Sequence, residues 1–151
     1  MLEKSQQEAK NWVSKAIAFY KDSGKEIALA EFTNPKGPFV QDEMYIFVLD
    51  PKGIMIAHGV NEKYIGKNFI DLKDSTGKSF IREIIKAANV NGNGWIDYQW
   101  YNPVTKETKP KNVYFERVDD LIFCSGIYIE SLVDEKLVDF MTIIVPGNWT
   151  G

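Results

Sequence analysis

The stretch Gly94-Trp95-Ile96-Asp97-Tyr98-Gln99-Trp100-Tyr101-Asn102-Pro103 leads through a turn-prone loop into Lys109-Pro110-Lys111-Asn112-Val113-Tyr114-Phe115. Both segments are rich in aromatic residues and predict two strands. Successive side chains of a strand point to opposite faces. Tyr98 and Trp100 therefore share a face with Ile96, and we expect that face to be buried.

A single lysine lies on an apolar face of the second strand. Lys111 shares that face with Val113 and Phe115. An ammonium group among apolar side chains is costly unless a negative group meets it, and aromatic walls around one cation suit a pocket for a small anion. The alternative is a lysine at a strand end that extends its amine to water, which is the usual behaviour of such a residue. Spacing alone favours this alternative.

The composition is that of an ordinary, mildly acidic globular protein. The 151 residues are 44% hydrophobic and 26% charged, with a net charge of -3, which fits one domain with a substantial core. Charges of both signs are mixed along the chain, so nucleic acid is not an expected partner.

No window approaches the roughly 18–20 apolar residues of a membrane span, and no signal peptide follows Met1. We expect a cytoplasmic protein or a mature segment that starts at an added methionine. Cys124, the only cysteine, is expected to be a buried, inert thiol.

Hydrophobic periodicity predicts the order of the elements. Apolar residues at helical spacing from about residue 2 to 22 predict a long amphipathic helix, which Ser23-Gly24 interrupts. Met44 to Leu49 is apolar at nearly every position, as in a central strand covered on both faces, and Asp50-Pro51-Lys52-Gly53 predicts a hairpin turn. We further expect a short helix around residues 27–32, a strand at 54–57, a helix at about 80–88 with Ser79 as its N-cap, strands at 95–100, 112–117 and 121–127, and a closing helix from 131 to about 141.

Common metal and phosphate motifs do not fit this sequence. Residues 89–100 resemble a calcium loop only faintly, because Trp100 stands where the bidentate glutamate is required. Gly77-Lys78-Ser79 ends like a P-loop, but Leu72 occupies the place of its first glycine. His58 is the only histidine, and no second metal ligand or nucleophile elbow accompanies it. We expect no metal and no cofactor, and interpret His58 as a hydrogen-bonded histidine or as a donor to a bound anion.

Taken in order, several segments resemble the single-Cache family of extracytoplasmic sensor domains, the input modules of bacterial chemoreceptors and histidine kinases. The resemblance extends over roughly residues 44–130 and the long helix before them, and rests on an ordered series rather than on one motif. The similar segments are Tyr45-Ile46-Phe47-Val48-Leu49-Asp50 with Gly53, Ala57-His58, Ile65-Gly66-Lys67-Asn68-Phe69, Asp71-Leu72-Lys73-Asp74 with Gly77-Lys78, Gly94-Trp95, Tyr98, Trp100, Asn102-Pro103, Lys111, Tyr114 and Ser125-Gly126-Ile127-Tyr128.

The resemblance implies an α+β fold, in which a PAS-like five-stranded antiparallel sheet carries the long N-terminal helix on one face and a small ligand on the other. It divides one sensor domain, residues 1–151, into the long helix at about 2–22, a core at about 40–130 and a tail at 131–151. The family's ligands are often small organic anions, and this subgroup resembles binders of short carboxylates. The resemblance also implies an extracytoplasmic location, periplasmic or at the cell surface, a role in signal transduction or chemotaxis, and no catalysis.

Seven residues carry over as ligand-binding candidates from the family pattern. They are Tyr98, Trp100, Lys111, Tyr114, His58, Tyr45 and Phe47. Lys111 would contact the anion, a tyrosine hydroxyl would donate a hydrogen bond, and Trp100 and Phe47 would form the apolar end. Tyr114 has the opposite parity from Lys111, so that it reaches the same pocket only through a bulge or a twist.

Three alternatives to a receptor module stay open. An enzyme could use Lys111 or His58 as a base or nucleophile, since burial lowers the pKa of a lysine. A stand-alone secreted binding protein is the second, because the family's receptors have a transmembrane helix on each side of the domain and this sequence shows neither. The third is an interaction domain without a ligand that forms a homodimer through its N-terminal helix, whose apolar stripe fits either its own sheet or a second copy.

Overall fold

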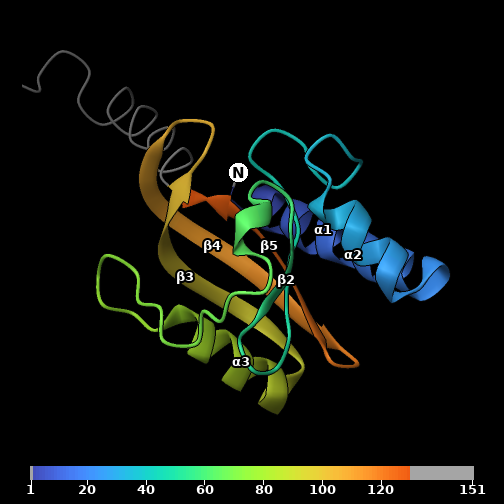
Figure 1. The fold of residues 1–151 in the computed structure, drawn as a ribbon. Coiled ribbons are helices and arrows are strands. Elements are labelled where there is room, and N and C mark those ends of the chain that lie inside the picture. Colours follow the sequence, from blue (N-terminus) through green and yellow to red (C-terminus); the bar gives the residue numbers. More distant parts are fainter. Residues whose placement is uncertain (1, 130–151) are drawn as a thin grey trace, which may run out of the picture.

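The computed structural model describes residues 2–129, and within them five strands form one antiparallel sheet (Figure 1). The spatial order is β2-β1-β5-β4-β3. The strands are Phe47–Leu49 (β1), Met55–His58 (β2), Asn93–Asn102 (β3), Glu107–Val118 (β4) and Leu121–Tyr128 (β5). The predicted α+β class, with an antiparallel sheet behind a long N-terminal helix, is confirmed.

Two helices cover one face of the sheet (Figure 1). α1 (Leu2–Ser23) packs on β4 and β5, and α2 (Lys25–Thr33) lies beside it. The break between them falls at Gly24, whose φ of 90° is available to glycine without strain. α1 buries Val13 and Ile17, four residues apart, in one cluster with Phe123 of β5. The apolar stripe of the long helix therefore packs on its own sheet.

The opposite face of the sheet carries a second core. α3 (Phe80–Asn91) and the segment between β2 and α3, which contains the 3-10 helix Glu62–Tyr64, lie over this face (Figure 1). The inward stripe of α3 consists of Phe80, Ile81, Ile84, Ile85 and Ala88. This stripe packs against Val113 and Phe115, which belong to the same buried cluster on β4. Because strand side chains alternate, the side chains on this face differ from those under α1 and α2, and a site can form between the sheet and the elements that cover this face.

The two strands quoted at the start of the sequence analysis are longer than predicted. β3 and β4 pair without interruption from Asn93↔Glu116 to Asn102↔Glu107. The hairpin turn before β2 is as predicted, because the amide of Gly53 donates to the carbonyl of Asp50 at 3.1 Å. The strand predicted at residues 44–49 begins only at Phe47, since Met44 pairs with Gln41 in a separate bridge.

Ser79 occupies the N-cap position of α3, as predicted, but its hydroxyl makes no cap hydrogen bond. Its φ of -84° and ψ of 68° differ from the extended backbone of a capping residue. The helix predicted from 131 to about 141 lies outside the described residues. Within residues 2–129, none of the helices combines the length and the apolar character that crossing a bilayer requires.

Phe32 anchors α2 to the sheet and offers a test of this packing. Its side chain is 0% exposed, and its ring lies 4.9 Å from that of Phe39 and 6.0 Å from that of Phe123. Phe32→Ala should lower the free energy of unfolding by about 3–5 kcal/mol in urea denaturation. Ile27→Ala, on the same helix at 59% exposed, is the control and should change it by about 0.5 kcal/mol or less. Equal losses in the two variants would contradict the assigned packing of α2.

Candidate functional site

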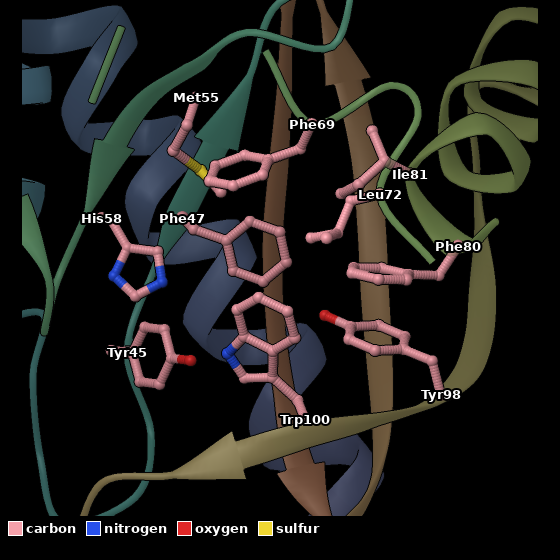
Figure 2. A pocket seen from close by; sticks show the side chains of 10 residues that line it. All are labelled: Tyr45, Phe47, Met55, His58, Phe69, Leu72, Phe80, Ile81, Tyr98 and Trp100. Atoms are coloured by element: carbon pink, nitrogen blue, oxygen red, sulfur yellow. The ribbon is translucent and has the colours of Figure 1, made fainter. Parts of the chain in front are cut away.

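A small cavity lies between the sheet and the elements that cover its second face (Figure 2). About 260 Å³ between its wall residues is free of protein atoms, a volume that includes space open to solvent. The wall is formed by Tyr45, Phe47, Met55, His58, Phe69, Leu72, Phe80, Ile81, Tyr98 and Trp100.

The edge strand β3 supplies two aromatic residues of the wall. Tyr98 and Trp100 lie two residues apart and both point into the cavity, as their parity predicts (Figure 2). Phe80, the first residue of α3, stacks on Tyr98 with ring centroids 4.1 Å apart and planes 14° apart. The same ring meets Trp100 edge-on at 5.5 Å. The start of α3 thus fixes the orientation of both aromatic side chains.

Three hydrogen-bond donors of the wall have no partner among the described residues. They are the Tyr98 hydroxyl, the Trp100 indole nitrogen and His58 Nε2, and none of them hydrogen-bonds to another group within residues 2–129. Fully buried side-chain nitrogen and oxygen atoms in the described residues all have partners, so these three atoms border free space. In Figure 2 the Tyr98 hydroxyl points inward toward Trp100, and the Trp100 nitrogen points toward Tyr45 and His58. The cavity therefore offers donors to an acceptor-rich ligand.

His58 is held as a neutral imidazole with a fixed proton position. Its Nδ1 accepts hydrogen bonds from the amides of Asn61 at 3.0 Å and Val60 at 3.3 Å. Burial, followed by the charge of Lys111, lowers the His58 pKa to about 3. The proton of the neutral ring consequently lies on Nε2, which makes this nitrogen a donor. Within residues 2–129, no three His, Cys, Asp or Glu side chains gather in a way that would hold a metal ion.

Lys111 is buried next to the cavity rather than extended to water. Its side chain is 1% exposed, so the interpretation as a strand-end lysine that reaches solvent is wrong. On the sheet it pairs with Tyr98 of β3 and Tyr128 of β5. Its Nζ lies 4.3, 5.3 and 5.5 Å from the ring centroids of Tyr45, Tyr128 and Phe47. Three aromatic rings thus surround the amine, within the range of cation–π attraction.

The amine of Lys111 has no carboxylate partner among the described residues. The three ion pairs found in residues 2–129 involve other lysine and arginine side chains. Lys111 Nζ donates instead to the Tyr45 hydroxyl at 2.9 Å. Burial lowers the Lys111 pKa to about 7, because removal from water disfavours the charged form. Lys111 is not itself part of the wall and reaches the cavity through the Tyr45 hydroxyl.

Tyr114 lies on the other face of the sheet, away from the cavity. It belongs to the cluster under α1, where its ring packs 5.1 Å from that of Trp95. Its hydroxyl donates to Glu116 at 2.6 Å. The strand between Lys111 and Tyr114 is regular, so the bulge that would bring Tyr114 to the cavity is not formed.

Five residues of the wall were not among the sequence candidates. They are Met55, Phe69, Leu72, Phe80 and Ile81. Their apolar pattern marks them as inward-facing, but inward-facing side chains line a cavity or fill a core with the same periodicity. Whether they line a cavity or fill a core depends on how α3 and the segment between β2 and α3 are spaced over the sheet, and no short motif encodes that spacing.

The comparison with protein families agrees with this geometry. The family model for single Cache domain 2 matches residues 2–137, which is most of the chain. The chain belongs to the single Cache family. Single Cache domains are extracytoplasmic sensor domains that bind small molecules.

Solved Cache structures share the fold. A methyl-accepting chemotaxis protein from Vibrio parahaemolyticus is 26% identical with a TM-score of 0.76, over 87% of this chain and 93% of that one. A structure described as the basis for carboxylic acid recognition by a Cache chemosensory domain is 24% identical with a TM-score of 0.70, over 84% of this chain and 92% of that one. The sensor histidine kinase MctS of Rhizobium johnstonii is 30% identical over 90 residues, which are 58% of this chain. The match spans 19% of that relative's length.

Lys111→Met tests whether the buried amine lacks a counter-ion. The unfolded chain binds a proton at Lys111 up to a pKa of about 10.4, whereas the folded chain releases it near 7. Stability must therefore rise with pH between these values, and we expect wild type to gain about 2 kcal/mol over Lys111→Met between pH 7 and pH 9. The free energy of unfolding is measured with urea in buffer free of carboxylates and phosphate.

Lys86→Met, at an exposed position of α3, serves as the control and should follow the pH dependence of wild type. Parallel pH profiles for wild type and Lys111→Met would mean that the amine stays charged in the fold, and would contradict its isolation.

Proposed function

We propose that this Cache domain senses a small organic anion, a short carboxylate, and that it acts in signal transduction or chemotaxis. The observation that carries the proposal is the buried amine of Lys111, held against the wall of a small cavity without a carboxylate partner among the described residues. A ligand carboxylate would supply the missing negative charge. Charge-assisted hydrogen bonds away from water are among the stronger polar contacts.

The two ends of the cavity suit the two ends of a short carboxylic acid. At one end lie Tyr45, Tyr98 and the nitrogens of Trp100 and His58, with Lys111 behind Tyr45. Apolar side chains, among them Leu72, form the other end (Figure 2). The carboxylate would bind at the polar end, with its hydrocarbon part at the apolar end.

Six of the seven candidate residues take part in this proposal. Tyr98, Trp100 and His58 would donate hydrogen bonds to the carboxylate. Lys111 would supply the positive charge through or beside the Tyr45 hydroxyl, and Phe47 would form part of the apolar wall. Tyr114 is left out, because it lies on the opposite face of the sheet.

The relatives support the ligand class and the setting. A protein of the same fold is described in terms of carboxylic acid recognition by a Cache chemosensory domain. Other relatives are a chemotaxis protein and a sensor histidine kinase. We infer that the chain serves as the extracytoplasmic input part of such a receptor, periplasmic or at the cell surface.

Binding fits the cavity better than catalysis does. Its wall of ten side chains contains no carboxylate and no thiol, so the usual acid–base pair of a hydrolytic site is missing from it. The homodimer considered from the sequence would need the outer face of α1, because its apolar stripe is occupied by the sheet. A ligand-free interaction domain would leave the unpartnered donors of the cavity without a role.

Calorimetric titration with propionate at pH 6.5 tests the proposal. Wild type should bind with a measurable affinity, because Lys111 is largely protonated at this pH. Lys111→Met should weaken binding by about 10- to 150-fold, which corresponds to roughly 1.5–3 kcal/mol for one charged hydrogen bond. Lys86→Met, an exposed lysine, should leave the affinity unchanged. Equal affinity of wild type and Lys111→Met would remove Lys111 from the site.

A further inference from the structure

Only part of the cavity wall reaches the protein surface. Seven of its ten wall residues are 5% exposed or less. The three partly exposed ones are Phe69, Leu72 and Trp100. Phe69 and Leu72 belong to residues 61–79, here called the cover segment, and Trp100 belongs to β3. The cover segment and the edge strand therefore form the solvent-exposed part of the wall.

The cover segment is fixed to the β1–β2 hairpin by backbone hydrogen bonds. The amide of Met55 donates to the carbonyl of Lys67 at 2.9 Å, and the amide of Gly66 donates to the carbonyl of Met55 at 2.8 Å. A third bond joins the amide of Phe69 to the carbonyl of Gly53 at 2.9 Å. Three main-chain bonds within a few residues make this side of the segment the firmly attached one.

On the β3 side, the carboxylate of Asp74 connects the cover segment to the edge strand. Asp74 Oδ2 accepts a hydrogen bond from the amide of Gln99 at 2.9 Å, and Gln99 lies between Tyr98 and Trp100. The other oxygen, Oδ1, accepts from the amides of Thr76 at 2.9 Å and Lys78 at 3.0 Å, and from the Thr76 hydroxyl at 2.6 Å. One oxygen thus organises the turn at residues 74–78, while the other ties that turn to the edge of the sheet.

A second, weaker tie supports the first. Lys78 Nζ donates to the carbonyl of Asp97 at 2.6 Å, but its side chain is 34% exposed and also lies 4.0 Å from Glu83. Burial is the largest single influence on the Asp74 carboxyl and raises its pKa, but the hydrogen bonds from Gln99, Thr76 and Lys78 together lower it to about 2. Asp74 therefore stays ionised, and its bond to Gln99 stays charge-assisted, at physiological pH.

We propose that Asp74 is a positioning residue that latches the cover segment to β3, and that release of its bond to Gln99 opens the route by which a carboxylate enters and leaves the cavity. The inference rests on the proposed function for the ligand. In this proposal the cover segment stays bound to the β1–β2 hairpin on one side and separates from β3 on the other. Entry passes between Leu72 and Trp100.

A latch has a kinetic signature that a ligand contact lacks. Asp74 does not line the cavity, so weakening its bond destabilises the closed form with and without ligand to a similar extent. The open form is then more populated in both states, and association and dissociation accelerate together. The equilibrium dissociation constant changes little, because the two rates change in the same ratio.

Asp74→Asn removes the latch while it retains the turn. An asparagine has one acceptor oxygen, which can serve the amides of Thr76 and Lys78, but its other atom is an NH₂ donor that faces the N–H of Gln99. Asp71→Asn is a charge-matched control on the same segment, since Asp71 is 85% exposed and pairs with Arg82. Both variants remove one negative charge and affect the approach of an anion alike.

Stopped-flow tryptophan fluorescence with propionate measures both rates. In Asp74→Asn, we expect association and dissociation to accelerate by about tenfold, the factor that the loss of one charge-assisted hydrogen bond predicts, with the dissociation constant within about threefold of wild type. Asp71→Asn should match wild type, and Lys78→Met should show a smaller acceleration of both rates. An Asp74→Asn variant whose rates match those of Asp71→Asn, or in which only dissociation changes, would overturn the latch.

Amide hydrogen exchange without ligand separates this inference from the proposed function. In Asp74→Asn, the amide of Leu72 should exchange faster, while those of Met55 and Gly66, on the attached side, should keep their wild-type rates. Failure of wild type to bind propionate would contradict the proposed function, and the exchange pattern would still decide the latch. Uniform acceleration at all three amides, or no change at Leu72, would overturn it.

Discussion

The amine of Lys111 is buried and has no carboxylate partner among the described residues. The aromatic and hydroxyl groups around it are the main feature of the site. Removing an ammonium group from water costs several kcal/mol. Three aromatic rings and the Tyr45 hydroxyl offset part of this cost, and the rest is expressed as a lowered Lys111 pKa. A negatively charged ligand would stabilise the charged form of the amine, and this is the basis on which we propose an anion as the ligand.

The sheet permits this arrangement because its two faces carry separate groups of side chains. α1 and α2 pack on one face with Phe123 and Tyr114, and they stabilise the fold without any part of the cavity. The other face can then hold a lysine, a neutral histidine and unpartnered donors beneath a cover of α3 and residues 61–79. Unsatisfied polar groups in a site lower the free energy of unfolding, so a fold that contains such a site needs a separate apolar core that stabilises it by more.

Strand parity and element order were predictable from the sequence, whereas the cavity was not. Alternation placed Tyr98 and Trp100 on one face and set Tyr114 apart from Lys111, as the register of β3 and β4 shows. Spacing alone favoured a solvent-exposed Lys111, since local sequence does not reveal that Tyr45 and Tyr128, from distant segments, close over its amine. The role of Asp74 in joining two segments was hidden for the same reason: its partner Gln99 is 25 residues away.

Proton uptake on ligand binding tests the central claim most directly. At pH 8, the ligand-free Lys111 amine is mostly neutral, because burial lowers its pKa to about 7, and a bound carboxylate must raise that pKa well above 8. Calorimetry of propionate binding in two buffers with different ionisation enthalpies yields the number of protons exchanged. The account predicts an uptake of close to one proton per propionate bound. Binding without proton uptake would contradict it, since the amine would then be charged before the ligand arrives or remain apart from it.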